Sequence, residues 1–156
     1  MCKKILLLFL LSLGQLIFSQ NIDRIEFESS NAIIIGSKIN IIIKPIKNNK
    51  RAKAKIKVEY KDNSFSKRIS QKEYLNICNS ILNIKDKIYT NTKDSLKTRC
   101  IDGASTEIVV FKNNTKKKYF LDCISPEDKI DDERNRFWYA AKLILETVRM
   151  KIEDLY

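Results

Sequence analysis

Residues 53–61 read Lys53-Ala54-Lys55-Ile56-Lys57-Val58-Glu59-Tyr60-Lys61, and this alternation decides the fold. Successive side chains on a β-strand point to opposite faces of the sheet. The apolar members therefore share one face with Tyr60, while the charged members share the other. One apolar and one charged face are typical of an antiparallel sheet that is covered on a single side.

Further strands are predicted on both sides of this stretch. Residues 38–46 are rich in β-branched side chains, and a polar turn at residues 47–51 joins them to residues 54–60, which predicts a β-hairpin. Pro45 lacks a backbone N–H, so we expect its end of the strand to lie at an edge of the sheet. The remaining strands are expected at residues 23–28, 65–69, 106–111 and 118–124.

Two helices complete the predicted domain. Ser70 and Glu73 fit a capping box, which predicts a helix at about residues 71–84. Its apolar stripe is expected to hold Tyr74, Leu75, Cys78, Ile81 and Leu82. The second helix is predicted at about residues 132–152, because apolar side chains recur there at helical spacing: Phe137, Ala141, Ile144, Val148 and Ile152. We expect residues 20–156 to form a single α+β domain, an antiparallel sheet of about five or six strands with both helices packed on one face.

Residues 1–19 have the layout of a secretory signal peptide. A positively charged start precedes an apolar run from Ile5 to Phe18, which Gln15 interrupts. A membrane anchor would need about 20 continuous apolar residues. We therefore expect a secreted or periplasmic protein that begins at Gln20 or Asn21 and has no membrane span once the signal is removed.

The composition excludes several classes of site. Histidine is absent from the 156 residues, which excludes Ser-His and Cys-His catalytic pairs and histidine-ligated metals. The three glycines are far apart, so no Gly-rich phosphate loop or dinucleotide fingerprint is present. No cofactor is expected on these grounds.

Positive charge is concentrated in one segment. Lys and Arg number 30 against 19 Asp and Glu, a net charge of +11, and residues 44–72 hold eleven of the basic residues against only Glu59 and Asp62. Such a surface attracts an anionic surface, a glycan or an acidic protein, whereas nucleic acid is disfavoured because aromatic side chains for base stacking are few. The alternative is a solvated face that protects the sheet from aggregation. The candidate binding residues are Lys53, Lys55, Lys57 and Lys61.

Three cysteines remain after signal removal. Cys100 and Cys123 flank the hairpin of residues 106–124, and they are a candidate disulfide. A tight turn after Cys100 would instead leave the two cysteines about two strand spacings, or ~10 Å, apart. Cys78 is then expected to be a buried thiol, and no histidine is present to activate a catalytic cysteine.

Acidic residues gather before the second helix. Such oxygen ligands could hold Ca²⁺ or Mg²⁺, but acids at helix N-termini are expected from the helix dipole alone, and we assign no metal site. These residues are Asp122, Glu127, Asp128, Asp131, Asp132 and Glu133.

The patterns favour a non-enzymatic exported binding protein with a basic sheet face, because they contain no recognisable catalytic constellation. The alternative is a small extracytoplasmic hydrolase that uses carboxylates, whose separation in space the sequence does not reveal.

Overall fold

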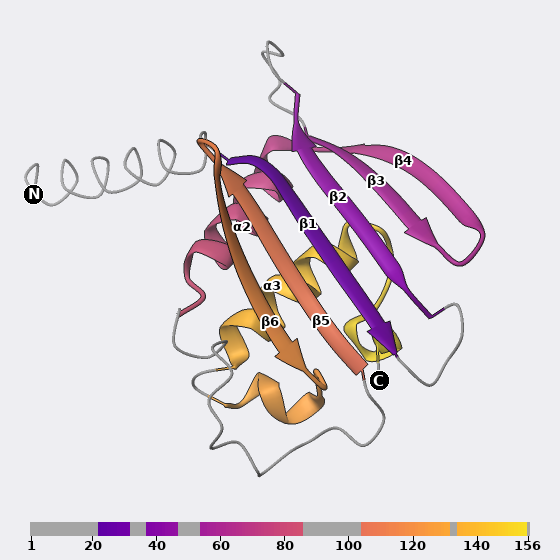
Figure 1. Cartoon of the computed structure of the whole chain (residues 1–156), viewed down its shortest axis with the longest axis vertical. Helices are drawn as coiled ribbons and strands as arrows, with labels where there is room; N and C mark the ends of the chain where they lie inside the picture. The colour runs from indigo at the N-terminus through magenta and orange to yellow at the C-terminus, as the bar shows by residue number, and fades with distance from the viewer. Residues whose placement is uncertain (1–21, 32–36, 47–53, 86–103, 132–133, 156) are drawn as a thin grey trace, which may run out of the picture.

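The computed structural model describes residues 22–31, 37–46, 54–85, 104–131 and 134–155. One antiparallel sheet has the strand order β4-β3-β2-β1-β5-β6 (Figure 1). Helices α2 (Gln71–Leu82) and α3 (Asn135–Glu146) lie against one face of it, which confirms the predicted α+β fold. The strands are β1 (Ile22–Asn31), β2 (Ile39–Pro45), β3 (Ala54–Tyr60), β4 (Asn63–Ile69), β5 (Ala104–Lys112) and β6 (Thr115–Asp122). Within these ranges we find no helix with the length and apolarity needed to span a bilayer.

The connections between neighbouring strands are tight where the structure describes them. Asn113 and Asn114 join β5 to β6 with φ values of 48° and 64°. Two positive φ angles are the requirement of the hairpin turn whose twist matches that of the strands, and Asn tolerates them well. Lys61 and Asp62 join β3 to β4, with Lys61 at a φ of 52°.

Pro45 does not lie on an edge strand, because β2 lies between β1 and β3. Pro45 pairs with Ala54 of β3, but the last residue of β2 paired with β1 is Ile43. The missing N–H of Pro45 therefore stands where the ladder with β1 has already ended, so proline is tolerated there.

The core lies between the helices and the inner face of the sheet. Phe27 on β1 and Phe137 on α3 are among the largest fully buried side chains. Ala140 and Ala141 of α3 are also fully buried, and their small size lets the helix backbone approach the sheet closely. The buried stripe of α2 differs slightly from the prediction, because Ile77 is buried while Leu82 is 41% exposed.

The predicted capping box at the start of α2 is confirmed. The backbone N–H of Glu73 donates to Ser70 Oγ at 3.2 Å, and the backbone N–H of Ser70 donates to Glu73 Oε2 at 2.8 Å. The hydrogen bonds to Ser70 lower the pKa of Glu73. Two N–H groups that lack partners within the helix are thus satisfied by this reciprocal pair.

The second helix is shorter than predicted. Residues 132 and 133, at its expected start, lie outside the described residues, and α3 ends at Glu146 rather than near residue 152. Arg149 takes a φ of 62°, and the N–H of Met150 returns to the carbonyl of Leu145 at 3.1 Å. The chain reverses direction in this left-handed turn, which is a common way for a helix to end. Ile152 is buried all the same, but in a separate 3₁₀ turn, η3 (Ile152–Leu155).

Replacing the cap of α2 tests this helix boundary. We expect Ser70→Ala to lower the free energy of unfolding by about 1 kcal/mol, since it removes the acceptor for the Glu73 N–H. Urea denaturation of the variant measures this loss. Ser66→Ala, at an exposed position of β4, should leave the midpoint unchanged, and equal midpoints for both variants would contradict the role of the cap.

Candidate functional site

The open face of the sheet, turned away from the helices, carries a row of three cations. In the pairing of neighbouring strands, Lys44 of β2 is opposite Lys55 of β3, and Lys55 is opposite Arg68 of β4. All three side chains are exposed, and none of them forms an ion pair with another described residue. We call Lys44, Lys55 and Arg68 the cationic row.

The cationic row is electrostatically unfavourable on its own. Side chains directly opposite each other on paired strands have Cβ atoms roughly 4.5–5.5 Å apart, and like charges in such pairs destabilise a sheet. Three adjacent strands span roughly 10 Å, so the three charges are concentrated within a short distance. An anion placed over the row would relieve the repulsion.

Three carboxylates lie on the open face of β1 and β5, and each forms an ion pair with a basic side chain. Glu26, Glu28 and Glu107 line a small pocket of about 130 Å³ together with Asn40 and Val109. Their ion pairs are Glu26 with Arg24 at 3.1 Å, Glu28 with Lys38 at 2.9 Å, and Glu107 with Lys118.

Charged side chains near this pocket also make other contacts. Arg24 also stacks on the ring of Phe111, with its guanidinium carbon 3.9 Å from the ring centroid. Hydrogen bonds from Lys57 and Asn40 lower the pKa of Glu59, which lies on the same face. Among the described residues of the open face, unpaired positive charge is therefore concentrated at the β2–β4 end, with Lys116 of β6, which lies over the Phe111 ring, as a separate case.

The structure brings together only part of the predicted lysine set. Lys55 lies in the cationic row, whereas Lys57, on the same face, is paired with Glu59 at 2.6 Å. Lys61 lies in the turn after β3 instead of on the strand, with its Nζ 5.1 Å from the centroid of the Tyr60 ring. Lys53 lies outside the described residues.

Two members of the cationic row were missed by sequence reasoning. Lys44 and Arg68 belong to the basic segment, but only the register of β2 and β4 against β3 places them beside Lys55. Alternation within single strands would have assigned Lys44 and Arg68 to one or the other face of the sheet. It could not have shown that the three charges are directly opposite one another.

The acidic residues before α3 stabilise the local chain. Asp128 is 2% exposed, accepts the backbone N–H of Ser125 at 2.8 Å, and pairs with Arg134 at 2.7 Å. Burial raises the pKa of Asp128, while its bond to Ser125 and the charge of Arg134 act in the opposite direction. Arg134 in turn donates to the carbonyl of Asp122 at 3.0 Å. Among the described residues, no three acidic or cysteine side chains are grouped as metal ligands.

The cysteines are placed in two different settings. Cys78 is a free thiol that is completely buried in α2. Burial raises its pKa to about 12. Cys123 directly follows β6, with a φ of 48°, whereas its predicted partner Cys100 lies outside the described residues. The disulfide therefore stays a prediction.

Comparison of the chain with models of known protein families and with curated proteins finds no match. The argument for function therefore depends on the surfaces of the molecule.

The buried thiol gives a test of the helix packing. We expect Cys78 to resist iodoacetamide at pH 8 in the folded protein, because reaction requires a thiolate and access to it. Peptide mass spectrometry should find Cys78 unmodified under native conditions and modified in guanidinium chloride. Rapid modification of Cys78 in the folded protein would show that α2 does not cover it.

Proposed function

We propose that this is a non-enzymatic exported binding protein, which holds an anionic partner on the open face of its sheet. The contact residues are those of the cationic row, Lys44, Lys55 and Arg68. The observation that carries the proposal is their direct opposition on three adjacent strands without a carboxylate partner among the described residues.

The electrostatics of the open face support this proposal. Elsewhere on the face, cations and carboxylates alternate and are paired, as in Lys57 with Glu59 and Lys38 with Glu28. Glu28 and Glu107 are also directly opposite each other, but each has a basic partner, whereas the described residues give the cationic row no carboxylate partner. The repulsion within the row has a cost in stability that a bound anion would offset. A positive patch of this kind also raises the rate at which an anionic partner associates.

The alternative of a carboxylate hydrolase receives less support. A glycosidase needs one carboxyl group as acid and a second as base or nucleophile, on either side of the substrate. In the small pocket of the open face, Glu26, Glu28 and Glu107 are each engaged by a basic side chain instead. We therefore favour binding over hydrolysis.

Charge removal tests the binding proposal. The triple variant Lys44→Gln, Lys55→Gln, Arg68→Gln should bind immobilised heparin, used as a model polyanion, about tenfold more weakly at low salt. Three exposed ion pairs at about 0.5 kcal/mol each account for this loss. The free energy of unfolding should change by no more than about 0.5 kcal/mol, since these side chains are exposed.

A second triple variant provides the control for total charge. Lys72→Gln, Lys85→Gln and Lys151→Gln remove the same charge from exposed positions outside the sheet. Elution of this control from heparin should need nearly the same salt concentration as elution of the unmodified protein. Equal losses of affinity in the two triple variants would contradict a localised site, and binding by the unmodified protein that is insensitive to salt would contradict an electrostatic one.

Export can be tested separately. We propose that residues 1–19 are removed on secretion, which is the fate of a signal peptide. Intact-mass measurement of exported protein should find Gln20 or Asn21 at the N-terminus. Exported protein that retains Met1 would contradict this.

A further inference from the structure

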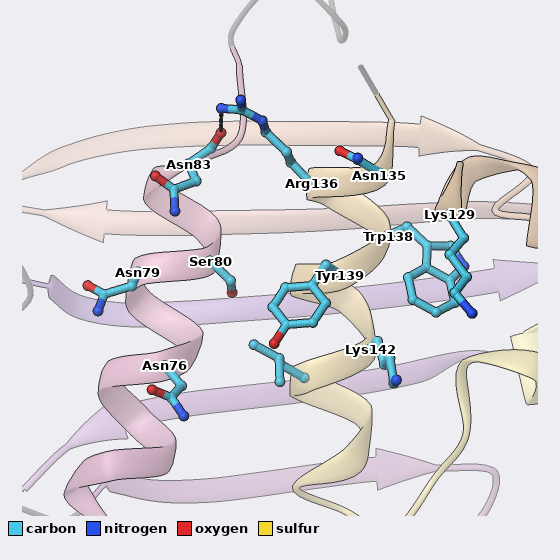
Figure 2. A pocket seen from close by; sticks show the side chains of 11 residues that line it. Asn76, Asn79, Ser80, Asn83, Lys129, Asn135, Arg136, Trp138, Tyr139 and Lys142 are labelled. Carbon is cyan, nitrogen blue, oxygen red and sulfur yellow. Dashed lines mark hydrogen bonds between the residues drawn. The ribbon is translucent and has the colours of Figure 1, made fainter. Parts of the chain in front are cut away.

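We infer that the groove between α2 and α3 binds an acidic oligosaccharide. The groove has a volume of about 810 Å³, within the range of small-molecule sites. It lies on the outer side of the helices, with the sheet behind them (Figure 2). This places it on the opposite side of the molecule from the cationic row. Apart from the aliphatic Leu143, its lining residues are polar, aromatic or basic: Asn76, Asn79, Ser80, Asn83, Lys129, Asn135, Arg136, Trp138, Tyr139 and Lys142.

Side-chain amides are the first feature that points to a saccharide. Asn76 and Asn79 lie on α2, Asn83 is its C-cap four residues further on, and Asn135 lies at the start of α3. Each amide offers two donors and an acceptor, which suits hydroxyl groups that both donate and accept. None of these four side chains hydrogen-bonds another described residue, so their polar atoms are available to a ligand.

Asn76 and Asn79 are also unfavourable for the stability of α2. Asn has low helix propensity, because its side chain competes for backbone hydrogen bonds. Lys, Glu or Ala at the solvent-exposed position of Asn76 would favour the helix more. Asn76 and Asn79 therefore carry a small cost in the stability of α2.

An exposed aromatic ring is the second feature. Tyr139 is 52% exposed, and Figure 2 shows its ring in the space between the two helices. The apolar face of a sugar ring can pack on such an aromatic surface while its hydroxyls reach the surrounding amides. Trp138, in contrast, is 6% exposed, and Figure 2 shows it on the side of α3 that is turned away from α2.

The charge of the lining selects an acidic ligand. Lys129, Arg136 and Lys142 line the groove, and no carboxylate is among its described lining residues. The ammonium groups of Lys129 and Lys142 lie 6.0 Å and 5.6 Å from the Trp138 ring. Arg136 donates to the carbonyl of Asn83 at 3.0 Å and so connects the two helices at one end of the groove. Lys142 also pairs with Glu146 at 3.6 Å, and Figure 2 shows both lysines on the side of α3 that is turned away from α2. A uronate or sulfate group would reach them where the ligand extends across α3.

A peptide fits this groove less well. A helical peptide requires an apolar groove, and an extended peptide requires the edge of a sheet to pair with. The groove is formed by two helices and offers no strand edge, and Leu143 is the one aliphatic side chain among its described lining residues. The chemistry of the lining therefore favours a saccharide over a peptide.

The experiment uses a panel of tetrasaccharides from heparin, chondroitin sulfate and polygalacturonate, with neutral galactotetraose as the comparison. We expect calorimetric titration to detect binding of at least one acidic member, at least tenfold tighter than the neutral one. Tyr139→Ala and the double variant Asn76→Ala, Asn79→Ala should each weaken that binding at least tenfold. The double variant should also unfold at a higher denaturant concentration than the unmodified protein, because Ala favours the helix.

Two controls separate this site from the cationic row and from a structural effect. Gln71→Ala, at an exposed position of α2 outside the groove, should retain tetrasaccharide binding. The triple variant of the cationic row should lose only the salt-sensitive binding at that row and keep the binding that Tyr139→Ala removes. The inference is overturned if no acidic tetrasaccharide binds at millimolar concentration, or if the groove variants bind as well as the unmodified protein. Tighter binding of a tetraglutamate peptide, lost in the same variants, would also overturn it in favour of a peptide ligand.

Discussion

The packing of α2 and α3 on one face of the sheet is the interaction on which the rest of the structure depends. Burial of apolar side chains between these layers is the main source of stability in a domain of this kind. Phe27 from the sheet and Phe137 from α3 are fully buried in that layer. Because the described part of the chain places both helices on the same side, the other face of the sheet is left to solvent and carries the charged side chains.

On the open face, most charged side chains are neutralised by a neighbour of opposite charge. Over most of its area, cations and carboxylates lie close together and neutralise each other, as with Arg24 and Glu26. The cationic row departs from that pattern, since Lys44, Lys55 and Arg68 oppose one another without a described acidic neighbour. Side chains that reduce stability without an evident compensating contact are often retained for binding. This argument connects the row to the proposed anionic partner.

The two proposed sites lie on opposite sides of one small domain. The cationic row is a flat, purely electrostatic surface, whereas the helix groove combines amides, a tyrosine ring and lysines around a volume of about 810 Å³. A flat charged surface gives fast, salt-dependent association, and a concave polar site gives geometric selection. A domain with both could hold a small acidic ligand and a larger anionic partner at once, because neither site shares a residue with the other.

The sequence by itself determined the strands, the cap of α2 and the class of fold, because these depend on neighbours a few residues apart. Alternation at residues 54–60 and the Ser70–Glu73 pair are local signals of this kind. The end of α3 was not predictable in this way. Val148 and Ile152 keep helical spacing, yet the left-handed turn at Arg149 brings Ile152 into the core by another path.

Only the tertiary structure decided which charges and which amides lie together. The cationic row depends on the register between three strands, and the groove depends on the packing of two helices that are more than fifty residues apart in the chain. Local periodicity assigns a side chain to a face, but it contains no information about the residue opposite it on the next element. That information arises only when the apolar faces pack together, because packing alone fixes how strands and helices are aligned with one another.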